Sequence, residues 1–257
     1  NVTGLVWMKC TYNADLTGCT GDPFPNYRKD WQGAKDYCEG LEFAGKDDWR
    51  LPGIYELITI VNYGKTGPAI DSTYFPNTMV TNWYWSEDVD SGDSARAWIV
   101  SFLSGIAYTQ IKKETNNEPL GYVRCVRGDE LDTQQFMDNG DGTVTDNGTG
   151  LMWLQEAQDG LIWSEALKYC EDLKFAGYTD WRLPDIKEMA SIIDFSKVYP
   201  AADKNFFPDT LGVVYFSSTT NLQVAQNVFC AYFHTGEVKY YSKTLYKYYA
   251  RCIRSAQ

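Results

Sequence analysis

The sequence predicts an α+β protein made of two tandem domains, each with two helices packed on a small, mainly antiparallel sheet. The main observation is an internal repeat: residues 31–56 and 163–188 align without gaps at a separation of 132 residues. Within each copy, apolar residues first follow a helical spacing and then form short strand-like runs. Because solenoid units are no longer than about 50 residues, a repeat of this length indicates two whole domains.

The length of the chain fits two domains that each have a core of their own. We assign residues 1–128 to the first domain and residues 129–257 to the second. The second copy opens with residues 136–146, which have no counterpart before Asn1, so the first copy is expected to lack this leader. The first copy has an insertion at residues 10–30, ahead of its first helix.

Short β segments are expected at the start of each copy. In the second copy, the Asp, Asn and Gly residues of 138–142 favour a tight turn that leads into a strand at residues 143–145. Another strand is expected at residues 151–153, and residues 5–7 match it in the first copy.

Two helices are expected next. Trp163, Ala166, Leu167 and Cys170 have the i, i+3, i+4, i+7 spacing of one helix face, and residues 31–41 repeat it. An Ala-Gly pair ends this helix in both copies. The motif Trp-Arg-Leu-Pro follows, and its proline suits the first turn of the second helix.

The Trp-Arg pairs at residues 49–50 and 181–182 invite a functional interpretation because they match so well. Their presence in both copies instead favours a structural role. We expect each tryptophan in the core and each arginine bound to a carboxylate or to backbone carbonyl groups of the same domain.

The second half of each copy is strand-like. Residues 83–86 match residues 214–217, and residues 97–102 match residues 228–233. A Ser-Gly or Thr-Gly turn follows, and an Arg-Cys-Val-Arg or Arg-Cys-Ile-Arg segment closes each copy as a strand. The predicted order is therefore β, α, α and then several strands.

Six of the seven cysteines are predicted to form three disulfides. Two cysteines recur in both copies, so each domain is expected to hold one bridge from its first helix to its last strand. Two further cysteines lie in the insertion and are expected to form a local bridge. The predicted pairs are Cys38–Cys125, Cys170–Cys252 and Cys10–Cys19.

Metal binding is a weaker interpretation of these cysteines. Zinc sites favour a CxxC spacing with nearby histidines, whereas this chain has no CxxC and His234 is its only histidine. The leftover Cys230 is expected to be a buried thiol. Disulfides place the protein outside the reducing cytosol, so we expect it to be extracellular, at the cell surface or in the periplasm.

Charge and composition exclude some partners and favour others. The net charge is −11 and no basic cluster occurs, which excludes nucleic acid. No apolar run reaches the roughly 18 residues that a membrane span needs. Aromatic residues make up 16% of the chain and include 19 Tyr, more than a core needs, because each buried hydroxyl requires a partner. Exposed aromatic residues are typical of binding faces.

The turn at the start of the second copy is the candidate metal site. Asp138, Asn139, Asp141 and Asp146 place oxygen ligands around glycines, as calcium loops do. The run departs from the EF-hand spacing and lacks its final Glu, so a plain hairpin of Asx turns is the favoured alternative. We expect no required cofactor, with calcium as the ion that this loop would take.

The ordered motif set resembles a known family. The run DNGDGTVTDNGTGLMW at residues 138–153, the AGxxDWRLP blocks at 44–52 and 176–184 and the RCVRG segment at 124–128 are similar to the DUF1566 family. This family is also known as the C-terminal domain of the Legionella collagen-like adhesin. The resemblance covers nearly the whole chain as two copies. It implies a C-type-lectin-like fold and a bacterial, secreted or surface-exposed binding domain.

The best-known member of that family binds sulfated glycans, a property that requires basic patches and does not transfer to this acidic chain. The sugar site of calcium-dependent lectins of this fold is also absent, because its Glu-Pro-Asn and Trp-Asn-Asp motifs do not occur. Aromatic and polar residues on loops and late strands are the candidate ligand contacts. They are Trp83, Tyr84, Arg96, Tyr108, Lys239, Tyr240, Tyr241, Lys243 and Tyr246.

Three hypotheses of function follow. The first is a secreted or surface-exposed bacterial adhesion protein, not an enzyme, that binds a carbohydrate or an extracellular protein. The second is a structural subunit of an extracellular assembly that associates with copies of itself. The third and least favoured is a carboxylate-dependent hydrolase, because the acidic residues are plentiful but no pair is placed by the sequence.

Overall fold

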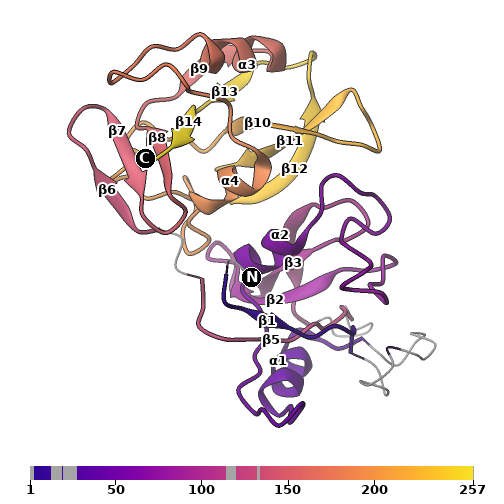
Figure 1. Ribbon diagram of the computed structural model, residues 1–257. Helices are drawn as coiled ribbons and strands as arrows, with labels where there is room; N and C mark the ends of the chain where they lie inside the picture. Colours follow the sequence, from indigo (N-terminus) through magenta and orange to yellow (C-terminus); the bar gives the residue numbers. More distant parts are fainter. Residues whose placement is uncertain (1–2, 13–18, 20–27, 114–119, 132–133, 257) are drawn as a thin grey trace. The chain divides into compact units, whose positions relative to one another are not determined.

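The computed structural model describes residues 3–12, 19, 28–113, 120–131 and 134–256. The chain divides into two compact units, Asn1–Leu131 and Asp132–Gln257 (Figure 1). Within the described residues each unit has two helices and mainly antiparallel strands, so the α+β class is confirmed. Most of the predicted insertion at residues 10–30 lies outside the described residues.

The first unit follows the predicted order of elements. Its opening strand pairs antiparallel with its closing strand, and three longer strands between them form an antiparallel meander. The elements are β1 (Val6–Trp7), α1 (Trp31–Glu39), α2 (Ile54–Ile60), β2 (Tyr84–Val89), β3 (Arg96–Val100), β4 (Ala107–Ile111) and β5 (Val126–Arg127).

The second unit adds the leader hairpin to the same plan. Strands β12, β11, β10, β13 and β9 lie side by side in that order, and β14, β8, β7 and β6 form another sheet. Only β10 and β13 run parallel among its described strand pairs. The elements are β6 (Phe136–Asp138), β7 (Thr143–Asp146), β8 (Leu151–Leu154), β9 (Gln158–Leu161), α3 (Trp163–Glu171), α4 (Ile186–Ser191), β10 (Val214–Thr220), β11 (Asn227–Tyr232), β12 (Glu237–Ser242), β13 (Tyr248–Ala250) and β14 (Ile253–Ser255).

The closing segment of the second domain differs from the single strand that the sequence predicts. β13 and β14 belong to different sheets and are separated by Arg251 and Cys252. Both residues are buried: the Arg251 side chain donates to the Leu154 carbonyl, and Cys252 is disulfide-bonded to Cys170. The Leu154 N–H of β8 donates to the Cys252 carbonyl, so the chain passes from one sheet to the other at these two buried residues.

The central strands are covered on both faces. In β3, Ala97 and Ile99 belong to the core cluster that contains residues of α1. Trp98 and Val100 therefore point to the opposite face, where α2 contacts β2 and β3. All four side chains are buried, which explains why this strand shows no alternation of polar and apolar residues.

The Trp-Arg pairs are structural, as predicted. Trp49 is buried, and its indole nitrogen donates to the carbonyl of Phe43 at 3.3 Å. The guanidinium of Arg50 donates twice to the carboxylate of Glu56, at 2.7 Å each. In the second domain Arg182 binds Glu188 in the same bidentate way. The motif thus joins the segment before the second helix to that helix.

The three predicted disulfides are confirmed. Cys38–Cys125 and Cys170–Cys252 tie the first helix of each domain to its closing segment across 87 and 82 residues. Cys10–Cys19 closes a local loop of the insertion. Cys230 is a buried free thiol, as expected from its isolated position in the sequence.

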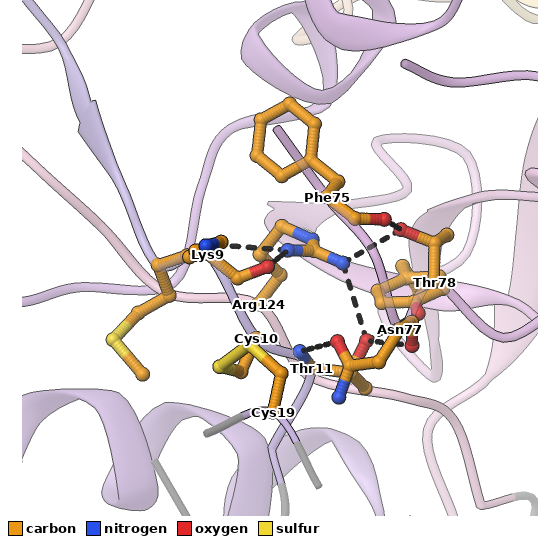
Figure 2. Close-up of a disulfide and its surroundings, with 10 residues drawn as sticks. Lys9, Cys10, Thr11, Cys19, Phe75, Asn77, Thr78 and Arg124 are labelled. Atoms are coloured by element: carbon orange, nitrogen blue, oxygen red, sulfur yellow. Dashed lines mark hydrogen bonds between the residues drawn. A yellow bond between two sulfur atoms is a disulfide. The ribbon is translucent and has the colours of Figure 1, made fainter. Parts of the chain in front are cut away.

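A buried arginine holds the interior of the first domain together. Arg124 is 1% exposed, and its Nη1 donates to the carbonyls of Met8 and Lys9 at 2.8 and 2.7 Å. Its Nη2 donates to the hydroxyls of Thr78 and Thr11 at 2.9 and 3.2 Å (Figure 2). The guanidinium therefore fixes the opening segment, next to Cys10, onto the loop that precedes β2.

The second domain repeats this network with different residues at two positions. Arg251 donates to Asp209 at 2.8 Å, whereas the matching position of the first domain is Asn77. Both side chains accept the same backbone bond, from Ala157 in the second domain and from Thr11 in the first. Asp209 and Ala157 of the second domain thus occupy the positions of Asn77 and Thr11 in the first. The first pair is a carboxylate beside a methyl group, and the second pair is an amide beside a hydroxyl.

Candidate functional site

The predicted ligand residues of the first domain do not form one exposed face. Tyr84 is fully buried, so its prediction as a ligand contact is wrong. Its hydroxyl hydrogen-bonds to that of Thr11 at 2.7 Å and accepts the backbone N–H of Met79 at 2.9 Å. Its equivalent Tyr215 is likewise buried and accepts the backbone N–H of Leu211. These tyrosines therefore form part of the scaffold.

The other three candidates of the first domain serve the fold as well. Trp83 is half-buried beside Trp85, and its indole nitrogen has no partner in the described structure. Arg96 donates to the hydroxyl and the carbonyl of Thr109 on the next strand, at 3.0 and 2.6 Å. Tyr108 packs against the core cluster around α1. We therefore place the candidate site in the second domain.

The adjacent Tyr240 and Tyr241 lie on opposite faces of β12. Tyr241 pairs with Val228 of the core cluster around α3, whereas Tyr240 pairs with Phe229 on the other face. The two rings cannot contact the same ligand surface. Tyr240, predicted together with Tyr241, therefore falls outside the site described next.

Three tyrosines of the second domain form a continuous set of ring contacts, the tyrosine ladder. It consists of Tyr241, Tyr248 and Tyr246. The rings of Tyr241 and Tyr248 meet edge to face at 5.4 Å, and those of Tyr248 and Tyr246 stack at 6.0 Å. The first two rings are half-buried, and Tyr246 is 56% exposed. The inner rings thus support an outer ring that presents its surface to solvent.

Charged groups flank the tyrosine ladder on β12 and directly after its end. Lys239 lies on the Tyr241 face of β12 and forms a 2.7 Å ion pair with Glu237. Lys243 lies 4.2 Å from the centre of the Trp163 ring and donates to the hydroxyl of Thr220 at 2.9 Å. The ladder is therefore bordered by groups that both donate and accept hydrogen bonds.

Burial and neighbouring rings raise the pKa of the two inner phenols of the ladder, Tyr241 and Tyr248. Desolvation raises the pKa of Tyr248 to about 12, and the nearby Tyr241 adds to this shift. Burial also raises the pKa of Tyr241. At neutral pH both groups are neutral and can donate hydrogen bonds.

The first domain has no such ladder, because its matching positions carry other residues. Gln110 corresponds to Tyr241, and Gly121 corresponds to Tyr248. A side chain at Gly121 would collide with the indoles of Trp85 and Trp83, because its Cβ would lie 2.6 and 2.9 Å from their nearest atoms. Large tryptophans on and beside β2 thus fill the space that Tyr248 fills in the second domain.

The predicted calcium loop forms a hairpin whose side chains bind neighbouring groups of the loop. Asp138 accepts the N–H of Gly140, and Asp141 accepts both the N–H and the hydroxyl of Thr143. Asp146 is buried and accepts from the segment that follows it, and the Asn139 amide donates to threonine hydroxyls. Within the described residues no group of three or more His, Cys, Asp or Glu side chains could hold a metal ion. These contacts are those of Asx turns, and calcium binding by this loop stays a prediction.

Possible catalytic features among the described residues include the Cys230 thiol and two surface depressions, and they give no support to catalysis. Burial raises the pKa of the Cys230 thiol far above its usual range, so the reactive thiolate is not formed at neutral pH. One surface depression of about 430 Å³ lies on α3, among charged side chains such as Glu165 and Lys168. Another, of about 330 Å³, is lined by residues 197–205.

A half-buried carboxylate of the first domain, Asp88, provides a test of pH dependence. Asp88 accepts the N–H of Ile54 at the start of α2, at 2.5 Å, where the second domain uses the hydroxyl of Thr219. Burial raises the pKa of Asp88, and the nearby carboxylates of Glu87 and Glu56 raise it further. Because its folded pKa exceeds the unfolded value, its stabilising contribution is present below the unfolded pKa and is lost as pH rises through the folded pKa.

We therefore expect Asp88→Asn, which keeps the acceptor for Ile54, to stabilise the first domain at neutral pH and to have little effect near pH 3. Urea unfolding at both pH values measures the difference. Asp71→Asn is the matched control of opposite sign, because the Thr73 backbone N–H lowers the pKa of Asp71. Equal effects of Asp88→Asn at both pH values would contradict the assignment.

Taken together, the fold and the site define a tandem, disulfide-bonded α+β protein of the class found outside reducing compartments. The chain belongs to the Lcl C-terminal domain family, whose profile matches residues 1–127 and 142–254. This match confirms the resemblance to DUF1566 and the presence of two tandem copies. No curated protein matches the chain. Among the helices of the described residues, none is long and apolar enough to cross a membrane.

Proposed function

We propose that the protein is a secreted or surface-exposed bacterial adhesion protein of two C-type-lectin-like domains, and that its second domain binds a carbohydrate. Membership of the adhesin-like Lcl C-terminal domain family and the three disulfides support the surface location. The observation that carries the carbohydrate assignment is the tyrosine ladder, which is exposed at Tyr246 and has no equivalent in the first domain.

The chemistry of the ladder favours a sugar over other ligands. An aromatic ring offers a flat apolar surface to the C–H face of a pyranose, and flanking polar groups can bind its hydroxyls. Glu237 and Lys239 supply an acceptor and donors on the same face of β12 as Tyr241. With a net charge of −11, the protein would repel sulfated or other polyanionic glycans. The favoured ligand is therefore a neutral or amino-substituted glycan.

The test is a broad glycan array followed by titration of the best neutral glycan. We expect Tyr246→Ala to weaken binding about tenfold, since a ring contact contributes roughly 0.5–1.5 kcal/mol beyond its area. The variant should remain folded, because the ring is largely exposed. EDTA should leave binding unchanged, because the proposed contacts are ring faces and hydrogen bonds.

Tyr74→Ala is the matched control, because Tyr74 is 69% exposed and belongs to the first domain. It should bind every glycan as the unchanged protein does. An array without any binding, combined with a solution mass that rises with protein concentration, would replace the proposal with self-association through this surface.

A further inference from the structure

A second group of aromatic side chains lies in the same domain as the tyrosine ladder. The rings of Tyr199 and His234 meet edge to face at 4.0 Å, and those of His234 and Tyr232 stack at 5.2 Å with an angle of 12° between their planes. Tyr199 is 67% exposed, whereas the other two are half-buried. We call this group the histidine platform. Like the ladder, it has inner rings that support an exposed outer tyrosine.

The backbone at Tyr199 indicates that this tyrosine is not there for the fold. Its φ is +60°, in the left-handed region that side chains with a Cβ avoid. The matching residue of the first domain is Gly67, which adopts φ +51°. The scaffold therefore requires the left-handed conformation in both domains, and glycine satisfies it at lower cost. An exposed tyrosine at such a position points to a role outside folding.

The other members of the platform are also specific to the second domain. Tyr232 corresponds to Ser101 and His234 to Leu103 in the first copy. His234 is the only histidine of the chain. All three positions thus change from small or aliphatic residues to rings. A coordinated change on one surface is expected of a site that one copy has and the other lacks.

The platform and the ladder are connected along β12. Tyr232 pairs with Glu237 at the start of this strand, and Tyr241 lies four residues further along it. At about 3.4 Å per residue the two positions are about 14 Å apart. Glu237 and Lys239 lie between them on the same face, joined by their ion pair. This arrangement places the inner ring of each group at one of the two ends and hydrogen-bonding groups in the middle.

The chain on both sides of Tyr199 also lines a surface depression, to which the three platform rings do not themselves contribute. The depression of about 330 Å³ is lined by residues on both sides of Tyr199, which are Lys197, Val198, Pro200, Ala202, Asp203, Lys204 and Asn205. This volume suits a small group such as one sugar ring. Its amine, carboxylate and amide groups can bind hydroxyls.

We propose that the second domain holds a linear oligosaccharide along β12, with one sugar stacked on the histidine platform and another on the tyrosine ladder. The inference rests on the proposed carbohydrate function and extends it from a single sugar to a chain of several. The inner rings Tyr232 and Tyr241 start from backbone positions about 14 Å apart, more than the width of one pyranose ring, so we expect a monosaccharide to occupy only one of the two groups. The ligand is neutral or carries amino groups, in accord with the acidic protein.

Tyr199→Gly tests this proposal without harming the fold, because it installs the residue that the first domain uses at this position. Wild type, Tyr199→Gly and Tyr246→Ala are titrated with hexasaccharides and monosaccharides of glucose, N-acetylglucosamine, mannose and xylose. Thermal unfolding of each variant is recorded in parallel. Tyr74→Gly is the control for loss of an exposed tyrosine elsewhere.

We expect one hexasaccharide to bind at least tenfold more tightly than its monosaccharide. Tyr199→Gly should reduce this advantage about tenfold, with an unchanged or higher unfolding temperature. A hexasaccharide that binds no better than its monosaccharide, with only Tyr246→Ala weakening it, would overturn the extended site and leave the proposed function standing. Loss of affinity together with loss of stability in Tyr199→Gly would assign the ring to the fold and overturn the inference. If no sugar binds, both proposals fail.

Discussion

Removing the Cys170–Cys252 disulfide is expected to lower the free energy of unfolding of the second domain by about 4.5 kcal/mol, on the chain-entropy relation. The bridge joins residues 82 positions apart, and closing so long a loop removes much freedom from the unfolded chain. Both cysteines are fully buried in the cluster that α3 forms with the sheet. The bridge therefore holds α3 against the segment between β13 and β14.

The measurement is thermal unfolding of the double variant Cys170→Ala/Cys252→Ala. A loss of this size in a domain of this length lowers the unfolding temperature by roughly 15 °C. Cys10→Ala/Cys19→Ala is the comparison, because its nine-residue separation predicts a loss of only about 2.7 kcal/mol. A smaller loss for the long loop than for the short one would contradict the entropic account.

Replacing Arg251 by methionine is expected to cost the second domain about 3–5 kcal/mol, the range for breaking a buried charge network. Arg251 donates to the carbonyls of Leu154 and Gln155 and to the side chains of Asp209 and Thr210. Methionine fills a similar volume but leaves these acceptors without a donor. Arg182→Met is the control, because this half-exposed arginine should cost no more than about 1 kcal/mol. Urea unfolding measures both variants.

Two substitutions that give the second domain the residues of the first test whether these positions act together in the arginine network. Asp209→Asn copies one half of the arrangement in the first domain and removes the counter-charge of Arg251. Adding Ala157→Thr copies the other half, because Thr11 supplies a hydroxyl to Arg124. The second substitution should recover part of the stability that the first one loses. Strictly additive effects would mean that the two positions do not act together.

Most of the scaffold could be predicted from local sequence patterns. The spacing of Trp163, Ala166 and Cys170 indicated the first helix. Duplication of the cysteines identified two disulfides, and the insertion of the first copy identified the third. The matching Trp-Arg pairs indicated a structural role that the Arg50–Glu56 contact confirms. These features depend on helical period and on the repeat, and both are visible along the chain.

The candidate site could be predicted only in part, because its residues meet through strand pairing. Tyr240 and Tyr241 look equivalent in the sequence, but the register of β12 with β11 sends them to opposite faces. The sequence predicts an exposed Tyr84, whereas in the structure its hydroxyl binds Thr11, which is distant in sequence. The only signal for Tyr199 and His234 was their divergence from Gly67 and Leu103 of the first copy.

The sequence by itself determined the two-domain α+β plan, the disulfides and the family, because repeats, periods and cysteine spacing are one-dimensional properties. Only the tertiary structure decided which tyrosines are accessible, because exposure depends on what packs against each side chain. It also showed that Asp146 is buried and accepts hydrogen bonds from its own turn, since the direction of a carboxylate follows from the backbone turn and not from composition.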